Sequence, residues 1–597
     1  MKSLINSKKR TILYLIAAIG INLVLFLLVL KLNNCLFVTN DDMTMRDIAA
    51  GAYTGTPDGH LVFIQYAMGA LISGLYSVFA TVPWYSVVLY GTMFLSFVLI
   101  LYRLLALAKN AKMFVLNSLC FAFLIAVLFK YLVYPQYTVV SAILGGTAIF
   151  WYFTQKKEAS KKEFVADTIL IVLLCSLSYM MRQDSFLICA AVLLVGFIIK
   201  LIAYKKAYLK RAGILVLVLL LCLGSIFITE KVAYSAQEFK DYEAFNVPRS
   251  RVYDYHGVPP YEADQQLYQK IGIDYSTYLN LTDYSTEVGS AVNAEAMEAI
   301  ADANDVTYKH QTGIAAQLRN AVPPFADMFL NAHYINVMTL CVLMFLATAL
   351  FISILNHKRM KIWLLILSTL TIALLAFYIA FGGRVIERVT MIFILVSLMV
   401  SFSVIAVNEQ YELTFLAKCK GRKVISWVLA AAFFVFAGAA FVQVVNKNKT
   451  VMASEGAFLD GRFRALQTVE TYMQEHPQNL YYSSVYVLTN NTDKLLTHND
   501  TQFFNNAYAG GWMAKSPMHY ERLEKLGMKK DFAEGLVTQP QALFLSPPDN
   551  MPSMKAYIEE HYENKTLEQV DMIQVTDASG ASIYDFGVYR ATDRIKA

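Results

Sequence analysis

Charge is scarce in this chain. Only 16% of its 597 residues are Asp, Glu, Lys or Arg, whereas 57% are hydrophobic. A soluble protein of this length needs more charge to cover its surface. The composition therefore excludes a soluble protein and predicts a polytopic membrane protein. The formal charge of +6 comes from 51 basic and 45 acidic residues, and the basic excess lies in loops that flank apolar runs. Nucleic acid is therefore not an expected partner, whereas membrane lipids are.

Cysteines are lacking outside the apolar segments. All seven lie within or beside apolar runs, which excludes a disulfide framework and a CxxC metal site. The chain also lacks a Walker loop, a GxGxxG motif and an internal repeat of about 20 to 50 residues. ATP-driven transport and nucleotide-sugar binding by a Rossmann domain are thus unsupported. The run Thr11–Leu30 is too long for a signal peptide and has no cleavage site before Lys31, so it is expected to stay as an anchor.

What the chain has instead is a series of apolar runs long enough to cross a membrane, roughly 17 to 25 residues each. Eleven are clear, at 11–30, 84–108, 113–130, 136–154, 164–181, 185–204, 212–229, 334–355, 362–381, 388–407 and 424–445. A twelfth run, Leu61–Ala80, is ambiguous.

Basic residues decide whether the twelfth run crosses, because short cytoplasmic loops collect Lys and Arg. Six clusters are present: Lys8/Lys9/Arg10, Arg103/Lys109/Lys112, Lys156/Lys157/Lys161/Lys162, Lys205/Lys206/Lys210/Arg211, Lys358/Arg359/Lys361 and Lys418/Lys420/Arg422/Lys423. All six lie on one side only if Leu61–Ala80 does not cross. We therefore predict about eleven transmembrane helices, a cytoplasmic N-terminus and an extracytoplasmic C-terminus, with Leu61–Ala80 as a helix at the outer leaflet whose Gly69 and Gly74 permit close packing.

The predicted fold is an all-α polytopic membrane domain over residues 1–445, followed by a small extracytoplasmic α/β or α+β domain over 446–597. The membrane domain includes a first outer loop, 32–83, and a large outer loop, 230–333. In the large loop, Tyr253–Pro260 indicates a rigid turn and Ala291–Ala303 a short helix. In the tail, helices are predicted at Arg462–Glu475 and Met554–Tyr562, and strands at Leu480–Leu488, Ala542–Leu545, Gln569–Val575 and Ile583–Tyr589.

The first outer loop carries the leading candidates for chemistry. Adjacent Asp41 and Asp42, followed by Arg46, form a charged patch about ten residues past the first membrane helix. Capping of a helix by Asn-Asp is the ordinary alternative. Asp58 and His60 are second candidates, because a carboxylate under apolar cover can hold a shifted pKa and act as a base.

Two other outward loops are short yet carry arginine, against the positive-inside bias. Arg182 lies in one, and Arg384 and Arg388 lie in the other, four residues apart as on one face of a helix. Arginine suits forked recognition of phosphate oxygens. The alternative is internal pairing, of Arg182 with Asp184 and of Arg384 or Arg388 with Glu387. Aromatic residues at the same level, among them Tyr53, Trp84, Tyr134 and Tyr137, suit either sugar stacking or a simple membrane-interface belt.

Taken in order, these parts resemble the GT-C superfamily of integral-membrane glycosyltransferases. The resemblance is carried by the loop opening with Asp41-Asp42 after a first helix, by the surface helix Leu61–Ala80, and by Gln136-Tyr137-Thr138, Arg182 and the Arg384/Arg388 loop.

This resemblance implies a hexosyltransferase of a bacterial plasma membrane that uses a polyprenyl-phosphate sugar donor and a cell-envelope glycan or lipid acceptor. It implies an inverting mechanism in which Asp42, or failing it Asp41, is the base, and in which Arg182, Arg384 and Arg388 bind the donor phosphate. Arg46, Asp58, His60, Gln136 and Tyr137 are secondary candidates. Some members use a divalent cation, Mg²⁺ or Mn²⁺. The first loop has no DxD motif, so metal dependence is left open.

Other functions stay open. An O-antigen-type ligase or polymerase would place essential residues in the large loop, here Arg249, Arg251, His256 or His310. A lipid or polysaccharide transporter or flippase should show inverted repeats and broken helices with polar groups at mid-membrane, whereas these spans are expected to lack buried charge. A non-catalytic scaffold would fit if Asp41, Asp42 and the arginines proved dispensable.

Overall fold

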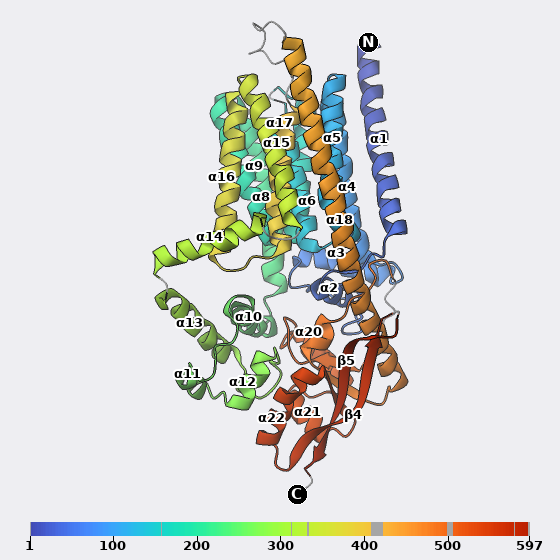
Figure 1. The fold of residues 1–597 in the computed structure, drawn as a ribbon, viewed down its shortest axis with the longest axis vertical. Helices are drawn as coiled ribbons and strands as arrows, with labels where there is room; N and C mark the ends of the chain where they lie inside the picture. The colour runs from blue at the N-terminus through green and yellow to red at the C-terminus, as the bar shows by residue number, and fades with distance from the viewer. Residues whose placement is uncertain are drawn as a thin grey trace.

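The computed structural model describes residues 2–156, 158–311, 313–330, 334–407, 422–497, 505–577 and 579–594. Within these ranges ten helices are long and apolar enough to cross a membrane. They are α1 (Lys2–Leu32), α4 (Trp84–Leu107), α5 (Ala111–Val133), α7 (Lys161–Met181), α8 (Gln183–Tyr204), α9 (Lys206–Ala233), α15 (Ile335–Leu355), α16 (Arg359–Phe381), α17 (Glu387–Ala406) and α18 (Arg422–Glu475). The helices form an upright bundle around one further helix, and the other elements lie at its lower end (Figure 1).

An eleventh helix, α6 (Tyr137–Phe153), runs through the centre of the bundle. All 17 of its residues are buried, and it packs on α4, α7, α8 and α17. At about 1.5 Å per residue it is about 25 Å long, slightly less than a hydrocarbon core. Two cations cap its C-terminal carbonyls: Arg103 donates to Thr154 O at 2.9 Å, and Lys200 donates to Tyr152 O.

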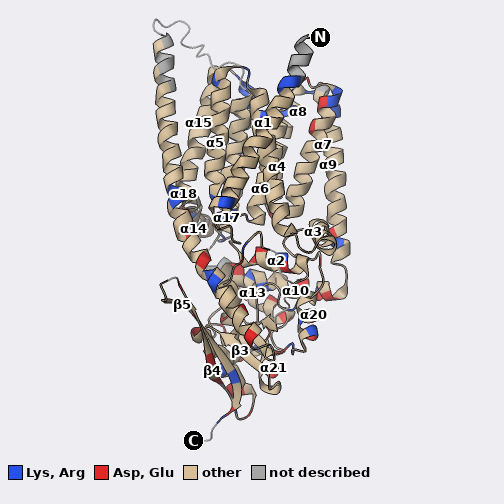
Figure 2. Cartoon of the chain, turned by 90° about the vertical axis from the view of Figure 1, so that its right-hand side faces the viewer, with Lys and Arg blue, Asp and Glu red and all other residues tan. Residues whose placement is uncertain are grey.

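The basic clusters gather at one end of the bundle. Arg10 donates to Ala108 O, which joins the first cluster to the second, and Arg211 donates to Ala159 O, which joins the fourth to the third. Charged residues lie at the top of the bundle and throughout the lower half of the molecule, and the helices between these regions are nearly free of them (Figure 2). The N- and C-termini lie at opposite ends (Figure 1). Of the last cluster, Lys418 and Lys420 lie outside the described residues.

The first outer loop folds into two short helices, α2 (Asn40–Ala50) and α3 (Tyr66–Val78). With 13 residues α3 is about 20 Å long, too short to cross a membrane. A Cβ on Gly69 would lie 2.0 Å from Gly59 O, so the predicted close packing is present there. At Gly74 the prediction is wrong, because a Cβ there would have no neighbour within 4 Å.

The large outer loop forms six short elements, of which the first five share a core of their own and the last packs against the bundle. They are α10 (Gln237–Arg251), the π-helical turn η1 (Val252–His256), α11 (Gln265–Lys270), α12 (Tyr275–Thr282), α13 (Ala294–Gln311) and α14 (Ile314–Leu330). The predicted helix at Ala291–Ala303 is therefore present in a longer form, and the predicted rigid turn begins as η1 and reverses at Gly257, whose φ is 75°.

The tail folds around a five-stranded sheet of order β2-β1-β3-β5-β4, in which β1 is parallel to β2 and β3 and the other pairs are antiparallel. The strands are β1 (Leu480–Ser483), β2 (Asn506–Tyr508), β3 (Ala542–Ser546), β4 (Lys565–Thr576) and β5 (Ser582–Asp593). The outer end of α18 covers one face. The other face is covered by α20 (Pro517–Leu526), α21 (Phe532–Thr538) and α22 (Met551–His561). The predicted fold class, a helical membrane domain with a small α/β domain, is confirmed.

Two predictions for the tail are wrong in detail. The strand expected at Leu480–Leu488 ends at Ser483, where Ser484 caps the short helix α19 (Val485–Thr489). The helix expected at Arg462–Glu475 is not separate, because α18 continues from the membrane through residues 445 and 446 without a break. Its 54 residues span about 80 Å.

Candidate active site

Helix α2 places the two leading carboxylates at its first turn, between the bundle and the outer parts of the molecule (Figure 1). Thr39 is the N-cap and Gly51, with φ of 84°, ends the helix. The cap is therefore Thr39 and not the Asn-Asp pair. Asp41 and Asp42 remain available for other contacts at the positive end of the helix dipole.

Asp42 is fully buried and held on both oxygens. Tyr85, at the start of α4, donates its hydroxyl to Oδ1 at 2.7 Å, and Thr39 donates to Oδ2 at 2.7 Å. Burial raises the pKa of Asp42 to about 7, against the lowering effect of these two hydrogen bonds, and the neighbouring charge of Asp41 raises it further. Asp42 is thus a fixed carboxyl group whose charge changes near neutral pH.

Asp41 is half-buried and faces cations. Burial raises its pKa, while the positive charges of Arg388 and Arg182 and a hydrogen bond from Trp512 act against that rise. These two arginines come from different parts of the bundle, and Trp512 comes from the C-terminal domain. Asp41 is therefore the point at which the first loop, the bundle and the outer domain meet.

Arg182 lies between α7 and α8 with its guanidinium packed on aromatic rings. Its Cζ is 5.4 Å from the ring centre of Phe63 and 5.6 Å from that of Tyr137. It also forms an ion pair with Asp184 at 2.9 Å, so the predicted internal pairing is present. Asp184 is mostly exposed, at 73%, and the positive charge of Arg182 still acts on Asp41 despite this pair.

Arg384 and Arg388 do not share a helix face, because Arg384 lies in the turn before α17 begins at Glu387. Arg384 pairs with Asp254 of η1 at 3.1 Å and packs on Tyr255. Arg388 is in the first turn of α17 and faces Asp41.

The expected partner of both arginines, Glu387, is engaged elsewhere. It accepts from Lys130 at 2.9 Å and from Tyr131 at 3.0 Å. Lys130 lies 3.3 Å from Glu455 of α18 as well. Among the described residues, no ion pair joins Glu387 to Arg384 or Arg388.

The secondary candidates divide into those at the site and those that build the fold. Tyr137 is at the site, beside Arg182 and Phe63. Gln136 caps α6 by accepting from the backbone N–H groups of Thr138 and Val139.

Arg46 is buried and ties the first loop to the C-terminal domain. It contacts Asp47 at 2.8 Å and Asp493 at 2.6 Å. Asp58 and His60 pair at 2.6 Å, and His60 stacks on Phe239 at the start of the large loop. All three residues join segments of the outer half of the molecule.

Three residues of the site were missed by sequence reasoning. Trp512 follows Gly510-Gly511, a flexible pair before a large aromatic residue, and that pattern was the available signal. Tyr85 and Asp254 gave no comparable signal, since an interfacial tyrosine and a loop aspartate are both common.

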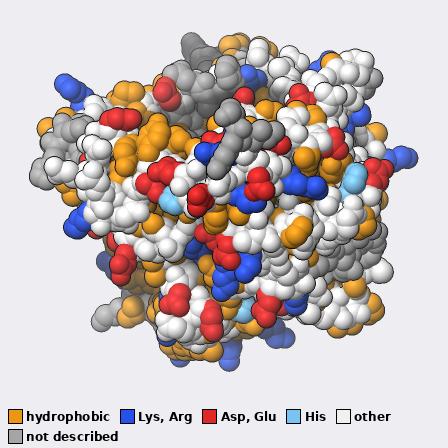
Figure 3. Space-filling model, turned by 90° about the horizontal axis from the view of Figure 1, so that it is seen from below, with side chains coloured by type: hydrophobic (Ala, Val, Ile, Leu, Met, Phe, Trp, Pro, Cys, Tyr) orange, Lys and Arg blue, Asp and Glu red, His pale blue; other side chains and the backbone are white. Residues whose placement is uncertain are grey.

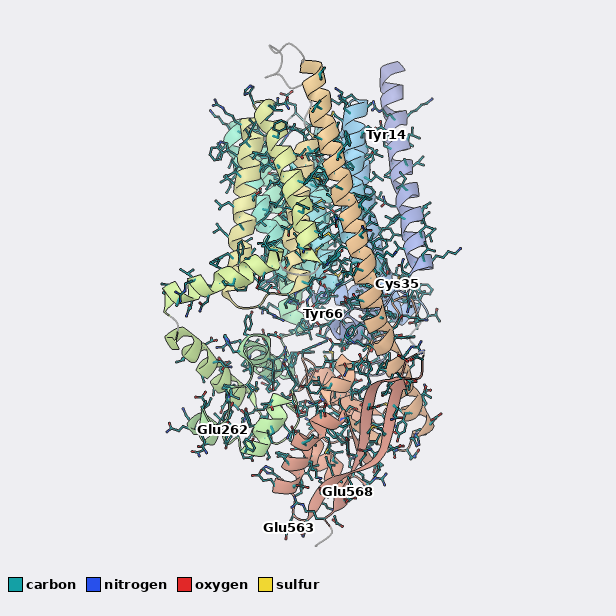
Figure 4. All side chains as sticks on the ribbon, in the orientation of Figure 1. Tyr14, Cys35, Tyr66, Glu262, Glu563 and Glu568 are labelled. Carbon is teal, nitrogen blue, oxygen red and sulfur yellow. The ribbon has the colours of Figure 1, made fainter. Side chains whose placement is uncertain are left out.

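The donor set around Asp41 and Asp42 does not suit a divalent cation. Both oxygens of Asp42 accept hydrogen bonds from hydroxyl groups, and Asp41 faces two guanidinium groups. Among the described residues, the one group with three close ligand atoms is Asp274, Glu560 and His561, far from this site at the junction of α12 and α22. In Figure 4 the outermost part of the molecule is marked by Glu563 and Glu568, whereas Tyr66 and Cys35 mark the level of the first loop.

Comparison with known proteins gives one distant likeness. No protein-family model matches the sequence, and no curated protein is similar to it. Two solved structures of ArnT from Cupriavidus metallidurans, one bound to undecaprenyl phosphate and one in the apo state, align with 96% of this chain and 97% of theirs. The TM-score is 0.41 in both cases, at 11% and 9% identity. Function therefore has to be inferred from the site itself.

Proposed function

We propose that this chain is a GT-C-type membrane glycosyltransferase of a bacterial plasma membrane. It moves a sugar from a polyprenyl-phosphate-linked donor to an extracytoplasmic cell-envelope acceptor. The observation that carries the proposal is the half-buried Asp41, on which the positive charges of Arg182 and Arg388 both act, because it combines a proton acceptor with two cations suited to a phosphate. The site lies where the apolar bundle ends, which suits a substrate with a lipid tail and a polar head.

The geometry favours Asp41 over Asp42 as the base. Both oxygens of Asp42 are occupied by Tyr85 and Thr39, and its side chain is fully buried, so it has no free edge for a substrate. Asp42 instead acts as a positioning residue that fixes the first turn of α2.

The reaction follows from these roles. The acceptor hydroxyl gives its proton to Asp41, and its oxygen attacks the anomeric carbon of the donor sugar from the face opposite the phosphate. The bond from that carbon to the phosphate oxygen breaks, and polyprenyl phosphate leaves with the bonding electrons. Arg182 and Arg388 neutralise the charge that develops on the leaving phosphate, so no general acid is needed. Attack from the opposite face inverts the anomeric configuration.

No observation favours the competing ligase reading. Arg251, one of its candidate residues, is engaged in ion pairs with Glu298, Asp302 and Asp305 at the surface of the large loop. Another, Arg249, donates to Asn246 within α10. His310 lies outside the residues whose side chains are described.

A transfer assay tests the proposal. Membranes from a deletion strain carrying the wild-type chain, Asp41→Asn or the surface control Asp549→Asn are given labelled polyprenyl-phosphate sugars, and label entering envelope material is measured. We expect transfer by the wild type and the control, and a loss of about 10²–10⁴ in rate for Asp41→Asn at unchanged protein level. Transfer by Asp41→Asn at the wild-type rate would refute the role of Asp41, and no transfer by the wild type from any polyprenyl-phosphate sugar would refute the function.

A further inference from the structure

A cavity of about 420 Å³ lies between α2, the outer end of α18 and the C-terminal domain. Its volume is within the range of about 300–1,000 Å³ that is usual for small-molecule sites. It is separate from the donor-phosphate arginines, none of which lines it. Three segments far apart in the sequence therefore converge on a space with no role in the mechanism derived above.

The cavity lies beside a residue that contacts Asp41, although Asp41 itself does not line it. Asn40, Thr44 and Asp47 line it from one face of α2, because positions i, i+4 and i+7 lie on the same side of a helix. Trp512 lines it from the C-terminal domain, and the same residue donates a hydrogen bond to Asp41. A ligand in the cavity thus lies against the residue that contacts the proposed base.

Several polar groups of the lining have unused hydrogen-bonding capacity. Asn491 is 1% exposed, and its Oδ1 has no partner among the described residues. Glu470 of α18 is half-buried near Asp47 and Asp493, and its side chain forms no hydrogen bond with the described part of the chain. Leaving such groups unpaired is costly, so they indicate a ligand that can donate hydrogen bonds.

The charge of the lining points to a neutral ligand. Three cations face two carboxylates and Glu470, whose pKa is raised to about 7 by burial and by the charges of Asp493 and Asp47. Neither a strongly anionic nor a strongly cationic molecule is therefore favoured; the six groups are Asp47, Glu470, Asp493, Arg46, Lys494 and Arg522. Aromatic residues complete the wall, with Trp512 and Tyr508 from the C-terminal domain and Tyr53 from the first loop. Polar groups of balanced charge can bind the hydroxyl groups of a ligand, and the aromatic side chains beside them can pack against apolar C–H faces. Such a wall suits a molecule that has both. The outer end of the molecule likewise shows both signs of charge intermixed (Figure 3).

We propose that this cavity binds a neutral saccharide portion of the acceptor and presents its reacting hydroxyl to Asp41. Glu470 and Asn491 accept hydrogen bonds from its hydroxyl groups, and Trp512 guides the sugar toward the carboxylate. This inference rests on the proposed function, since it assigns the acceptor of that reaction. The lipid-linked donor and the acceptor then approach Asp41 from different sides. The donor comes from the bundle and the acceptor comes from the outer domain.

Binding and transfer are measured separately to test it. The probe is delipidated, labelled envelope polysaccharide from a strain in which this gene is deleted, and its binding to the purified full chain is measured by co-elution in gel filtration. The variants are Glu470→Gln and Thr44→Val, which keep side-chain size, with Glu475→Gln, an exposed residue near the end of the same helix, as the matched control. All are also made in an Asp41→Asn background, which removes catalysis.

We expect the wild type and Asp41→Asn to bind the polysaccharide equally. Glu470→Gln should weaken binding about tenfold and Thr44→Val about threefold or more, as loss of hydrogen bonds to a ligand implies. In the transfer assay the same variants should need a correspondingly higher acceptor concentration, with an unchanged response to donor concentration. Glu475→Gln should match the wild type in both.

The outcomes separate the two proposals. No binding by the wild type, or equal binding by the wild type, Glu470→Gln and Thr44→Val, would overturn the assignment of the cavity even if transfer is observed. Binding that depends on Glu470 without transfer from any polyprenyl-phosphate sugar would leave the cavity as a saccharide site and refute the glycosyltransferase function.

Discussion

At the scale of single residues, the central feature is a pair of adjacent carboxyl groups with different surroundings. Asp42 is enclosed by hydroxyl donors, whereas Asp41 is half-buried between cations. Neighbouring side chains on a helix point about 100° apart, so one turn can place one acid in the core and the other at a reaction site. Both acids have raised pKa values, and this leads to a prediction for pH dependence.

We expect transfer to slow as pH falls below the raised pKa of Asp41, which is a higher pH than an ordinary carboxyl base would require. A base acts only when ionised, and a raised pKa means that Asp41 and Asp42 take up protons at a higher pH than ordinary carboxyl groups. Below this pH the rate should fall by roughly tenfold per pH unit. The measurement is the pH profile of transfer at saturating donor.

The variant Tyr85→Phe sharpens that test. The Tyr85 hydroxyl lowers the pKa of Asp42, so its removal should move the acid limb of the profile to higher pH. Tyr90→Phe is the control, since Tyr90 lies on the same helix and donates to Val133 O instead. An unshifted limb in Tyr85→Phe would show that Asp42 does not influence the ionisation that limits the rate.

The arginines give a second prediction at this scale. Arg388→Gln should lose a charge-assisted contact to the donor phosphate, about 1.5–3 kcal/mol, and slow transfer at limiting donor by roughly tenfold or more. Arg388→Lys should recover only part of the lost transfer rate, because an ammonium group lacks the planar fork of a guanidinium group. Arg384→Gln should have a smaller effect, since Arg384 is paired with Asp254. The measurement is the transfer rate as a function of donor concentration at matched protein levels. An Arg388→Gln chain whose rate depends on donor concentration as in the wild type would contradict a phosphate role.

At the scale of elements, the sequence predicted those helices and strands that are defined by nearby residues. It did not predict features that depend on contacts between distant segments. Ten spans and the start of β3 follow from apolar runs, and the sequence contains those directly. The continuity of α18 could not be predicted in this way. Polar residues after Asn446 look like a loop when it is unknown that the helix packs on the sheet. The meeting of Asp41 with Trp512 also could not be foreseen, because it depends on a contact between residues 471 positions apart.

Helix α3 gives a prediction with an internal control. Gly69→Ala should destabilise the chain, since its Cβ would lie 2.0 Å from Gly59 O and backbone must move. Gly74→Ala, on the same helix, meets open space and should be neutral or stabilise by about 0.5–1 kcal/mol. Fluorescence-detected gel filtration after a heating series compares them. Equal thermal stability of the two variants would show that the contact between Gly59 and Gly69 is not tight.

At the scale of the whole molecule, the architecture depends on which side each loop faces. In the described part of the chain ten helices are long enough to span and α6 runs among them, the two chain ends lie at opposite ends of the molecule, and the clusters joined by Arg10 and Arg211 share the N-terminal end. The positive-inside bias predicts that this end is cytoplasmic.

Labelling of introduced cysteines tests this orientation. Ser160 lies in the loop between α6 and α7 and Ser454 lies on the outer half of α18, and both are exposed. In intact cells an impermeant thiol reagent should label Ser454→Cys but not Ser160→Cys, and permeabilised cells should show labelling of both. Labelling of Ser160→Cys in intact cells would reverse the topology and place the candidate active site on the cytoplasmic side.

The unbroken helix α18 has a mechanical consequence. A loop between membrane and outer domain would absorb an inserted or deleted residue, but a continuous helix converts it into a rotation of about 100° and a shift of about 1.5 Å. The outer domain would then swing around the helix axis and carry Trp512 away from Asp41 and Asp493 away from Arg46. Both the length of this segment and the rotation of the outer domain about its axis are therefore constrained. Side chains on its solvent side can change in evolution, but residues can be added or removed only in steps close to whole turns.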